Sequence, residues 1–95
     1  MSKYVLRLYI TGHTSRSLRA IKALEQICAE EMNQGYELDV VDIRENPHLA
    51  EEDQVLATPT LIKRLPLPIR RIIGDLNDRE KVLIALDLKT GSGDG

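Results

Sequence analysis

The sequence predicts a single α/β domain whose elements follow the order strand, helix, strand, helix, strand, strand, helix. Apolar runs typical of strands lie at residues 4–10, 36–43 and 61–73, and a long stretch with helical apolar spacing separates the first two runs. The chain of 95 residues has room for one small core, which aliphatic side chains must fill because tyrosine is its only aromatic residue type. We expect the domain to span residues 1–88 and residues 89–95 to form a disordered tail.

The first strand is predicted at residues 4–10, where nearly every side chain is apolar, as in a central strand that is covered on both faces. Thr14 and Ser15 then offer an N-cap for a helix that should run to about Met32. The apolar positions of this helix recur every three or four residues, at Ala20, Ile21, Leu24, Ile27 and Cys28.

A second strand is predicted at residues 36–43, because Gly35 ends the helical pattern and apolar and acidic side chains then begin to alternate. The right-handed crossover through the helix makes the first two strands parallel. Asn46 as the N-cap and Pro47 in the first turn predict a short helix that runs to about Val55.

Two further short strands are predicted at residues 61–65 and 69–73. They are joined through Pro66 and Pro68, which cannot donate a hydrogen bond to a sheet and therefore belong at edges or strand ends. The simplest arrangement of this segment is a pair of strands linked by the prolines.

The last element has apolar spacing that fits both a helix and a strand. Asn77, followed by Glu80 three residues later, has the pattern of a capping box. Helical spacing in the segment 81–88 selects Val82, Leu83 and Leu86. A period of two, which is typical of a strand, would place Ile84, Leu86 and Leu88 on one face of the same segment. The residues therefore support two packings, and a chain with two packings close in energy is able to switch folds.

This order of elements is the topology of a thioredoxin-like domain without the extra N-terminal elements. In that topology Pro59, in the motif ATPT, stands where the fold uses a cis proline, so we expect a cis bond before it. The loop 11–14 occupies the place where an oxidoreductase carries two cysteines, and it has none. The only cysteine, Cys28, lies on the apolar face of the first helix and is expected to be inert core packing.

No motif for catalysis or metal binding occurs in the sequence. His13 and His48 do not stand at a spacing that suits a metal, and no glycine-rich phosphate loop is present. We therefore expect no catalytic residue, no cofactor, no metal and no enzyme activity. The net charge of -2 provides no attraction to nucleic acid or to an anionic membrane. A single cysteine is typical of a reducing compartment, so we expect a cytoplasmic protein.

A basic cluster is the most distinctive charge feature of the chain. Lys63, Arg64, Arg70 and Arg71 lie within nine residues that include no acidic residue. Such a cluster is either a solvated face or a docking surface for an acidic partner, because arginines bind carboxylates well. RNA is disfavoured as the partner because no aromatic platform accompanies the charges.

Two long stretches of the chain carry a family resemblance. They are YVLRLYITG and NPHLAEEDQVLATPTLIKRLPLPIRRIIGDLNDREKVLIALDL. Through them the chain resembles the KaiB family of cyanobacterial clock proteins and their bacterial relatives over roughly residues 3–88. The resemblance implies a protein that binds the hexameric ATPase and autokinase KaiC, sequesters KaiA and favours dephosphorylation of KaiC.

The resemblance also implies two folds, a resting tetramer or dimer with a rearranged C-terminal half and a thioredoxin-like monomer that binds KaiC. Pro59, Ala85 and Asp87 are the residues expected to matter for the fold or the switch. Asp87 matches the family, whereas Ala85 stands where the family commonly has glycine. Alanine favours a helix over glycine by about 1 kcal/mol, so the thioredoxin-like state should be more populated in this chain.

Partner contacts are expected to come from basic side chains. Arg19 matches a basic family position implicated in KaiC contact. The expected partner-binding residues are Arg19, Lys63, Arg64, Arg70 and Arg71. By contrast, Glu37, Asp39 and Gln54 stand where clock members of the family tend to have small or basic residues, a difference that can change partner specificity.

Two classes of function follow from these features. The first is a regulatory binding protein for a KaiC-like ATPase, in a circadian clock or a stress-response pair, with KaiA or a histidine kinase as further partners. The second is a thioredoxin-like sensor module that resembles the N-terminal domain of the kinase SasA, which would normally continue into a kinase. A third class, thiol redox chemistry at Cys28, would require rapid labelling of that thiol in the native protein.

Overall fold

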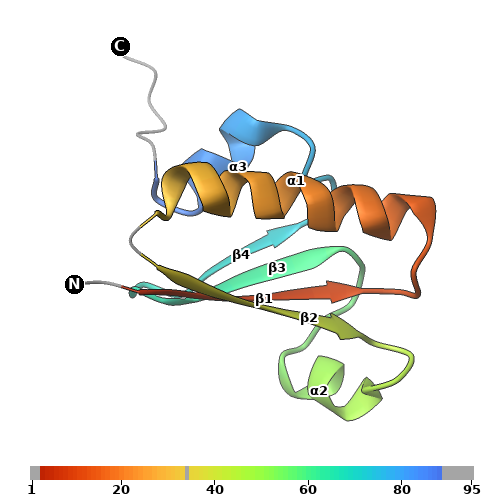
Figure 1. The fold of residues 1–95 in the computed structure, drawn as a ribbon. Helices are drawn as coiled ribbons and strands as arrows, with labels where there is room; N and C mark the ends of the chain where they lie inside the picture. The colour runs from red at the N-terminus through yellow and green to blue at the C-terminus, as the bar shows by residue number, and fades with distance from the viewer. Residues whose placement is uncertain (1–2, 34, 89–95) are drawn as a thin grey trace.

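The computed structural model describes residues 3–33 and 35–88 and has the predicted order of elements (Figure 1). The elements are β1 (Tyr4–Ile10), α1 (Ser15–Glu31), β2 (Tyr36–Asp42), α2 (Pro47–Glu52), β3 (Thr60–Leu65), β4 (Arg70–Ile73) and α3 (Arg79–Ala85). The predicted tail at 89–95 lies outside the described residues, so the boundaries of the domain remain a prediction.

One mixed sheet carries the fold, with its strands in the order β2-β1-β3-β4. β1 and β2 are parallel, as the crossover through α1 requires, and β3 runs antiparallel to β1 and to β4. α1 and α3 lie on one face of the sheet, whereas α2 lies beyond the other face, at the end where β1 terminates (Figure 1).

The core is divided by the sheet into two clusters. The larger cluster lies under α1 and α3 and includes Leu6, Leu8 and Leu24. The smaller cluster lies under α2 and includes Tyr9 and Ile62. Successive side chains of a strand point to opposite faces, so β1 contributes alternate residues to the two clusters.

The helix starts agree with the sequence at α1 and α2 and differ at α3. Thr14 caps α1 as predicted, through its hydroxyl and the Ser17 N–H. Asn46 is the N-cap of α2 and Pro47 lies in the first turn, as predicted, although no side-chain capping bond forms. The Asn46 amide donates to the Asp42 carbonyl oxygen, and α2 ends at Glu52, before the predicted end near Val55.

The start of α3 also differs from the expected capping box. The N-cap is Asp78, whose carboxylate accepts from the Lys81 N–H. Asn77 is engaged in the preceding turn, where its N–H donates to the Asp75 carboxylate. Both residue types are good N-caps, so local pattern could not decide between these neighbouring positions.

Candidate partner-binding surface

The loop at the position of a thioredoxin active site is held by a buried carboxylate. Asp42 accepts the N–H groups of Arg44 at 2.9 Å and Gly12 at 3.1 Å, and these two bonds hold the pKa of Asp42 below its usual range. The Thr58–Pro59 peptide is cis, as predicted, and the hydroxyl oxygens of Thr11 and Thr58 lie 2.7 Å apart. The loop that replaces the cysteine pair is therefore linked through Thr11 to the residue before the cis proline.

The only cysteine is placed where the sequence analysis expected it. Cys28 is fully buried in the larger core cluster. Burial, with a smaller contribution from Glu25, raises the pKa of the Cys28 thiol to about 11. The thiol is therefore protonated near pH 7 and is a poor nucleophile.

The sheet separates the predicted basic cluster into two pairs. Lys63 and Arg70 point to the face that carries α3, and Arg64 and Arg71 point to the face that carries α2. This separation follows from the alternation of side chains along β3 and β4. The four cations therefore do not form one continuous basic surface.

On the α3 face, Lys63 and Arg70 meet Asp87. Lys63 is only 1% exposed, and its Nζ donates to the Pro66 carbonyl oxygen at 2.8 Å and lies 3.7 Å from the Asp87 carboxylate. Arg70 Nε donates to the same carboxylate at 2.9 Å, which holds the pKa of Asp87 below its usual range. Lys63 therefore does not reach the surface as a free cation in this structure.

Ala85 and Asp87 lie at the end of α3. Ala85 is its last residue, and Asp87 follows the C-cap with a φ of 64°, in the left-handed region. A residue other than glycine needs support in that region, and the ion pairs to β3 and β4 provide it. The segment 81–85 is helical in this structure, which is one of the two packings that its apolar spacing allows.

On the α2 face, Arg64 and Arg71 converge on the end of α2. Arg64 donates to the Asp53 carboxylate, and Arg71 donates to the carbonyl oxygens of Asp53 and Gln54. Arg7 Nη1 lies 3.5 Å from the same carboxylate. We call this group, with the Tyr9 hydroxyl that also donates to Asp53, the Asp53 cluster.

The electrostatics of this cluster favour an ionised carboxylate. Burial works to raise the pKa of Asp53, but the Tyr9 hydroxyl and the Arg64 guanidinium outweigh burial and hold the pKa below its usual range. The pKa of Tyr9 is raised, first by burial and then by the bond to Asp53. Tyr9 therefore remains a neutral hydrogen-bond donor.

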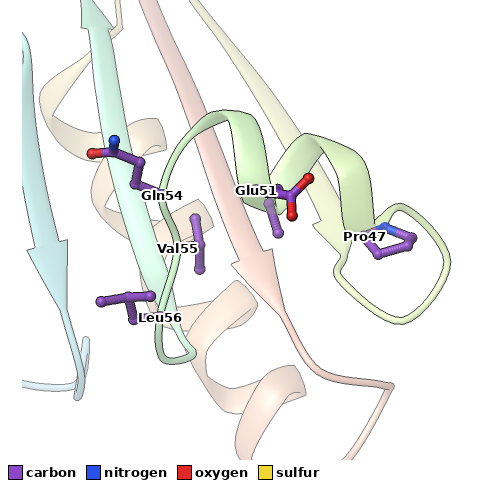
Figure 2. A pocket seen from close by; sticks show the side chains of 6 residues that line it. Pro47, Glu51, Gln54, Val55 and Leu56 are labelled. Atoms are coloured by element: carbon purple, nitrogen blue, oxygen red, sulfur yellow. The ribbon is translucent and has the colours of Figure 1, made fainter.

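A groove of about 590 Å³ opens beside the Asp53 cluster (Figure 2). We call it the α2 groove. Its lining residues are Pro47, Ala50, Glu51, Gln54, Val55 and Leu56. Leu56, on the loop from α2 to β3, is 96% exposed, so the lining of the groove includes an apolar side chain that faces solvent.

The remaining predicted contact residue, Arg19, lies away from the α2 groove. It is exposed on α1 and forms no ion pair with a described residue, although its charge helps to lower the pKa of Asp75 after the Asn77 hydrogen bonds. The sequence analysis missed the groove and the Asp53 cluster. The only local signal for the groove was the apolar pair Val55-Leu56 directly after a short helix.

Two further features are absent from the part of the chain that the structure describes. No group of three or more histidine, cysteine, aspartate or glutamate side chains is arranged to hold a metal ion there. No helix among the described residues is long and apolar enough to cross a membrane.

The fold and these side chains define a thioredoxin-like domain without the cysteine pair of the oxidoreductases. The KaiB domain model matches residues 7–88. The KaiB clock oscillator protein of Synechococcus elongatus is 60% identical over 88 residues, which cover 93% of this chain and 86% of that protein. The Microcystis aeruginosa KaiB clock protein is 61% identical over 85 residues, which cover 90% of this chain and 82% of that protein. The chain therefore belongs to the KaiB family.

Solved structures with low sequence identity agree on the fold. The N-terminal domain of Synechococcus elongatus SasA has a TM-score of 0.75 at 23% identity, covering 96% of this chain and 90% of that domain. A chloroplastic thioredoxin z has a TM-score of 0.71 at 22% identity, covering 94% of this chain and 80% of that protein. The thioredoxin-like fold predicted from the order of elements is confirmed.

Proposed function

We propose that this chain is a non-enzymatic regulatory protein that binds a KaiC-like hexameric ATPase and autokinase and thereby changes its phosphorylation state. The observation that carries this proposal is the 60% identity with a KaiB clock oscillator protein over 93% of the chain. The setting is a circadian clock or a related stress-response system in the cytoplasm, with KaiA or a histidine kinase as further partners.

Binding is proposed to accompany a change of fold in the C-terminal part. α3 has seven residues, too few for a stable isolated helix. Its ion pairs to α1 join Arg79 to Glu30 at 2.7 Å and to Glu31 at 2.8 Å, and all three side chains are exposed by more than a third. Exposed pairs contribute little to stability, so these ion pairs do not prevent α3 from detaching. The buried apolar contacts of Val82 and Leu86 are the main attachment, and contacts in a resting tetramer or dimer would have to replace them.

We assign partner contact to the α2 groove and to Arg19. The basic residues of β3 and β4 are bonded within the chain and would contribute by holding neighbouring elements in place. The groove combines aliphatic lining with the exposed Leu56, a composition that suits a central apolar anchor of a protein interface. Lys63 and Arg70 would act through Asp87 at the end of α3.

The test is capture of the KaiC homologue from the same host by this chain at several incubation times. We expect slow capture of a complex that contains the ATPase hexamer, because refolding precedes binding. Absence of capture at every time would contradict the proposal. Size-exclusion chromatography with light scattering would then report whether the free chain is a tetramer, a dimer or a monomer.

The alternative is a thioredoxin-like sensor module, and the observation that favours it is the fold shared with the SasA N-terminal domain. A sensor of this type keeps one fold, so it would capture its partner at once and remain monomeric. The time course of capture therefore separates the two functions.

A further inference from the structure

The end of α2 is fixed by side chains from three strands. Tyr9 of β1 donates to the Asp53 carboxylate and its hydroxyl lies 3.1 Å from the Leu49 carbonyl oxygen. Arg64 of β3 reaches the same carboxylate. The carboxylate and the last turn of α2 are thus held to the sheet from two neighbouring strands.

The third strand holds the backbone that follows. Arg71 of β4 donates to the carbonyl oxygens of Asp53 and Gln54. Gln54 has a φ of 55°, in the left-handed region where a side chain other than glycine is disfavoured. Next in the chain, the Val55 N–H donates to the Ala50 carbonyl oxygen at 2.8 Å. Residues 54–56 form the wall of the α2 groove. The first of them, Gln54, has a disfavoured backbone conformation, and the hydrogen bonds from Arg71 stabilise it.

We propose that Asp53, Arg64 and Arg71 are positioning residues that set the wall of the α2 groove for the partner, and that the two arginines do not serve as cationic contacts for an acidic surface. This inference rests on the proposed function. It reassigns Arg64 and Arg71, which the sequence presents as free cations.

The charges around the groove agree with this assignment. Both guanidinium groups are already bonded within the chain, on Asp53 and on the carbonyl oxygens beside it. Glu51 lines the groove and Glu52 follows it, and neither carboxylate forms an ion pair with a described residue. An approaching acidic surface would therefore meet free carboxylates before it met a free arginine.

The experiment measures dissociation of the chain from the host KaiC homologue with three variants and two matched controls. Asp53→Asn removes the charge at the centre of the cluster, and Arg64→Lys and Arg71→Lys keep the charge but lose the planar fork. Glu52→Gln makes the same charge change one residue from Asp53, and Arg16→Lys makes the same replacement at an exposed arginine without an ion pair among the described residues.

We expect about tenfold faster dissociation for each of the three variants, with both controls within about twofold of the parent and an unchanged salt dependence of association. If Arg64→Lys and Arg71→Lys dissociated like the parent, the arginines would act as charges and the proposal would be overturned. Faster dissociation of Glu52→Gln by the same factor would overturn it too, because general charge would then explain the effect.

A second measurement needs no partner and separates this inference from the proposed function. Amide hydrogen exchange in the free variants should accelerate at Val55, while the amides of β1 and β3 keep their protection. Unchanged exchange at Val55 in Asp53→Asn and Arg71→Lys would overturn the positioning role. If the parent never bound the ATPase but Val55 exchange accelerated, the proposed function would fail and the structural role would stand.

Discussion

The two short helices, α2 and α3, are attached to the sheet in different ways. α2 is joined through the Asp53 cluster, in which the side chains of Asp53 and Arg64 are 17% and 35% exposed. α3 is joined by ion pairs at the surface, where the side chains of Arg79 and Glu30 are 40% and 49% exposed. The polar attachment of α2 is therefore less sensitive to salt than the ion pairs that join α3 to α1. α3 depends mainly on its buried apolar side chains, and the Asp87 ion pairs support its end.

The largest effect should come from the apolar attachment of α3. Leu86 is fully buried in the larger core cluster, so Leu86→Ala should lower the free energy of unfolding by about 2–5 kcal/mol in urea titrations. The matched control is Leu56→Ala at the 96% exposed leucine, where we expect a change within about 0.5 kcal/mol. Equal losses at the two leucines would show that α3 is not held by its core contacts.

The next effect tests the polar attachment of α2. Asp53→Asn should lower the free energy of unfolding by about 1–3 kcal/mol at pH 7, because hydrogen bonds to a charged group are lost. The folded-state pKa of Asp53 is depressed, so its stabilisation is present above the unfolded pKa of about 3.9 and is lost as pH falls through the folded pKa.

The pH dependence provides the control for this prediction. The difference between parent and Asp53→Asn should shrink below about pH 4, as measured by urea titrations at several pH values. A difference that stays constant down to pH 2 would mean that the carboxylate charge does not hold α2.

A smaller effect is expected at the end of α3. Ala85→Gly should lower the stability of the helix by up to about 1 kcal/mol, the value for a helix interior, because alanine prefers the helix and Ala85 is the last residue of α3. In NMR spectra of the free chain, the ratio of the form with the α3 described here to the alternative form should fall by up to roughly fivefold, which is what 1 kcal/mol implies. An unchanged spectrum would show that residue 85 does not influence the choice between folds.

Much of the fold was predictable because its signals are local. The cap at Thr14, the apolar face of α1 and the position of Cys28 all follow from residues a few positions apart. The cis bond before Pro59 was predictable only once the order of elements had identified the fold. The cap of α3 was not, since the neighbouring polar side chains Asn77 and Asp78 are both suited to that role.

The candidate site was less predictable because it depends on the pairing of strands. Tyr9 and Asp53 are 44 positions apart, and only the antiparallel pairing of β1 with β3 brings Arg7 and Arg64 towards one carboxylate. From the sequence alone, Lys63 would be expected at the surface because it is charged. In the structure it is buried, because it lies on the central strand β3 beside Asp87. Alternation along β3 and β4 alone would have predicted that the basic cluster divides between two faces.

The smallest effect concerns the exposed ion pairs between α3 and α1. Arg79→Ala should lower the free energy of unfolding by less than about 1 kcal/mol, and the loss should vanish in 1 M salt. The control is Lys22→Ala on α1, an exposed lysine without an ion pair among the described residues. Because salt screens exposed charges much more than partly buried ones, the loss caused by Asp53→Asn should largely persist in the same buffer. If salt erased both losses equally, the two helices would not differ in how they are attached, and α3 would have no special reason to be the element that detaches.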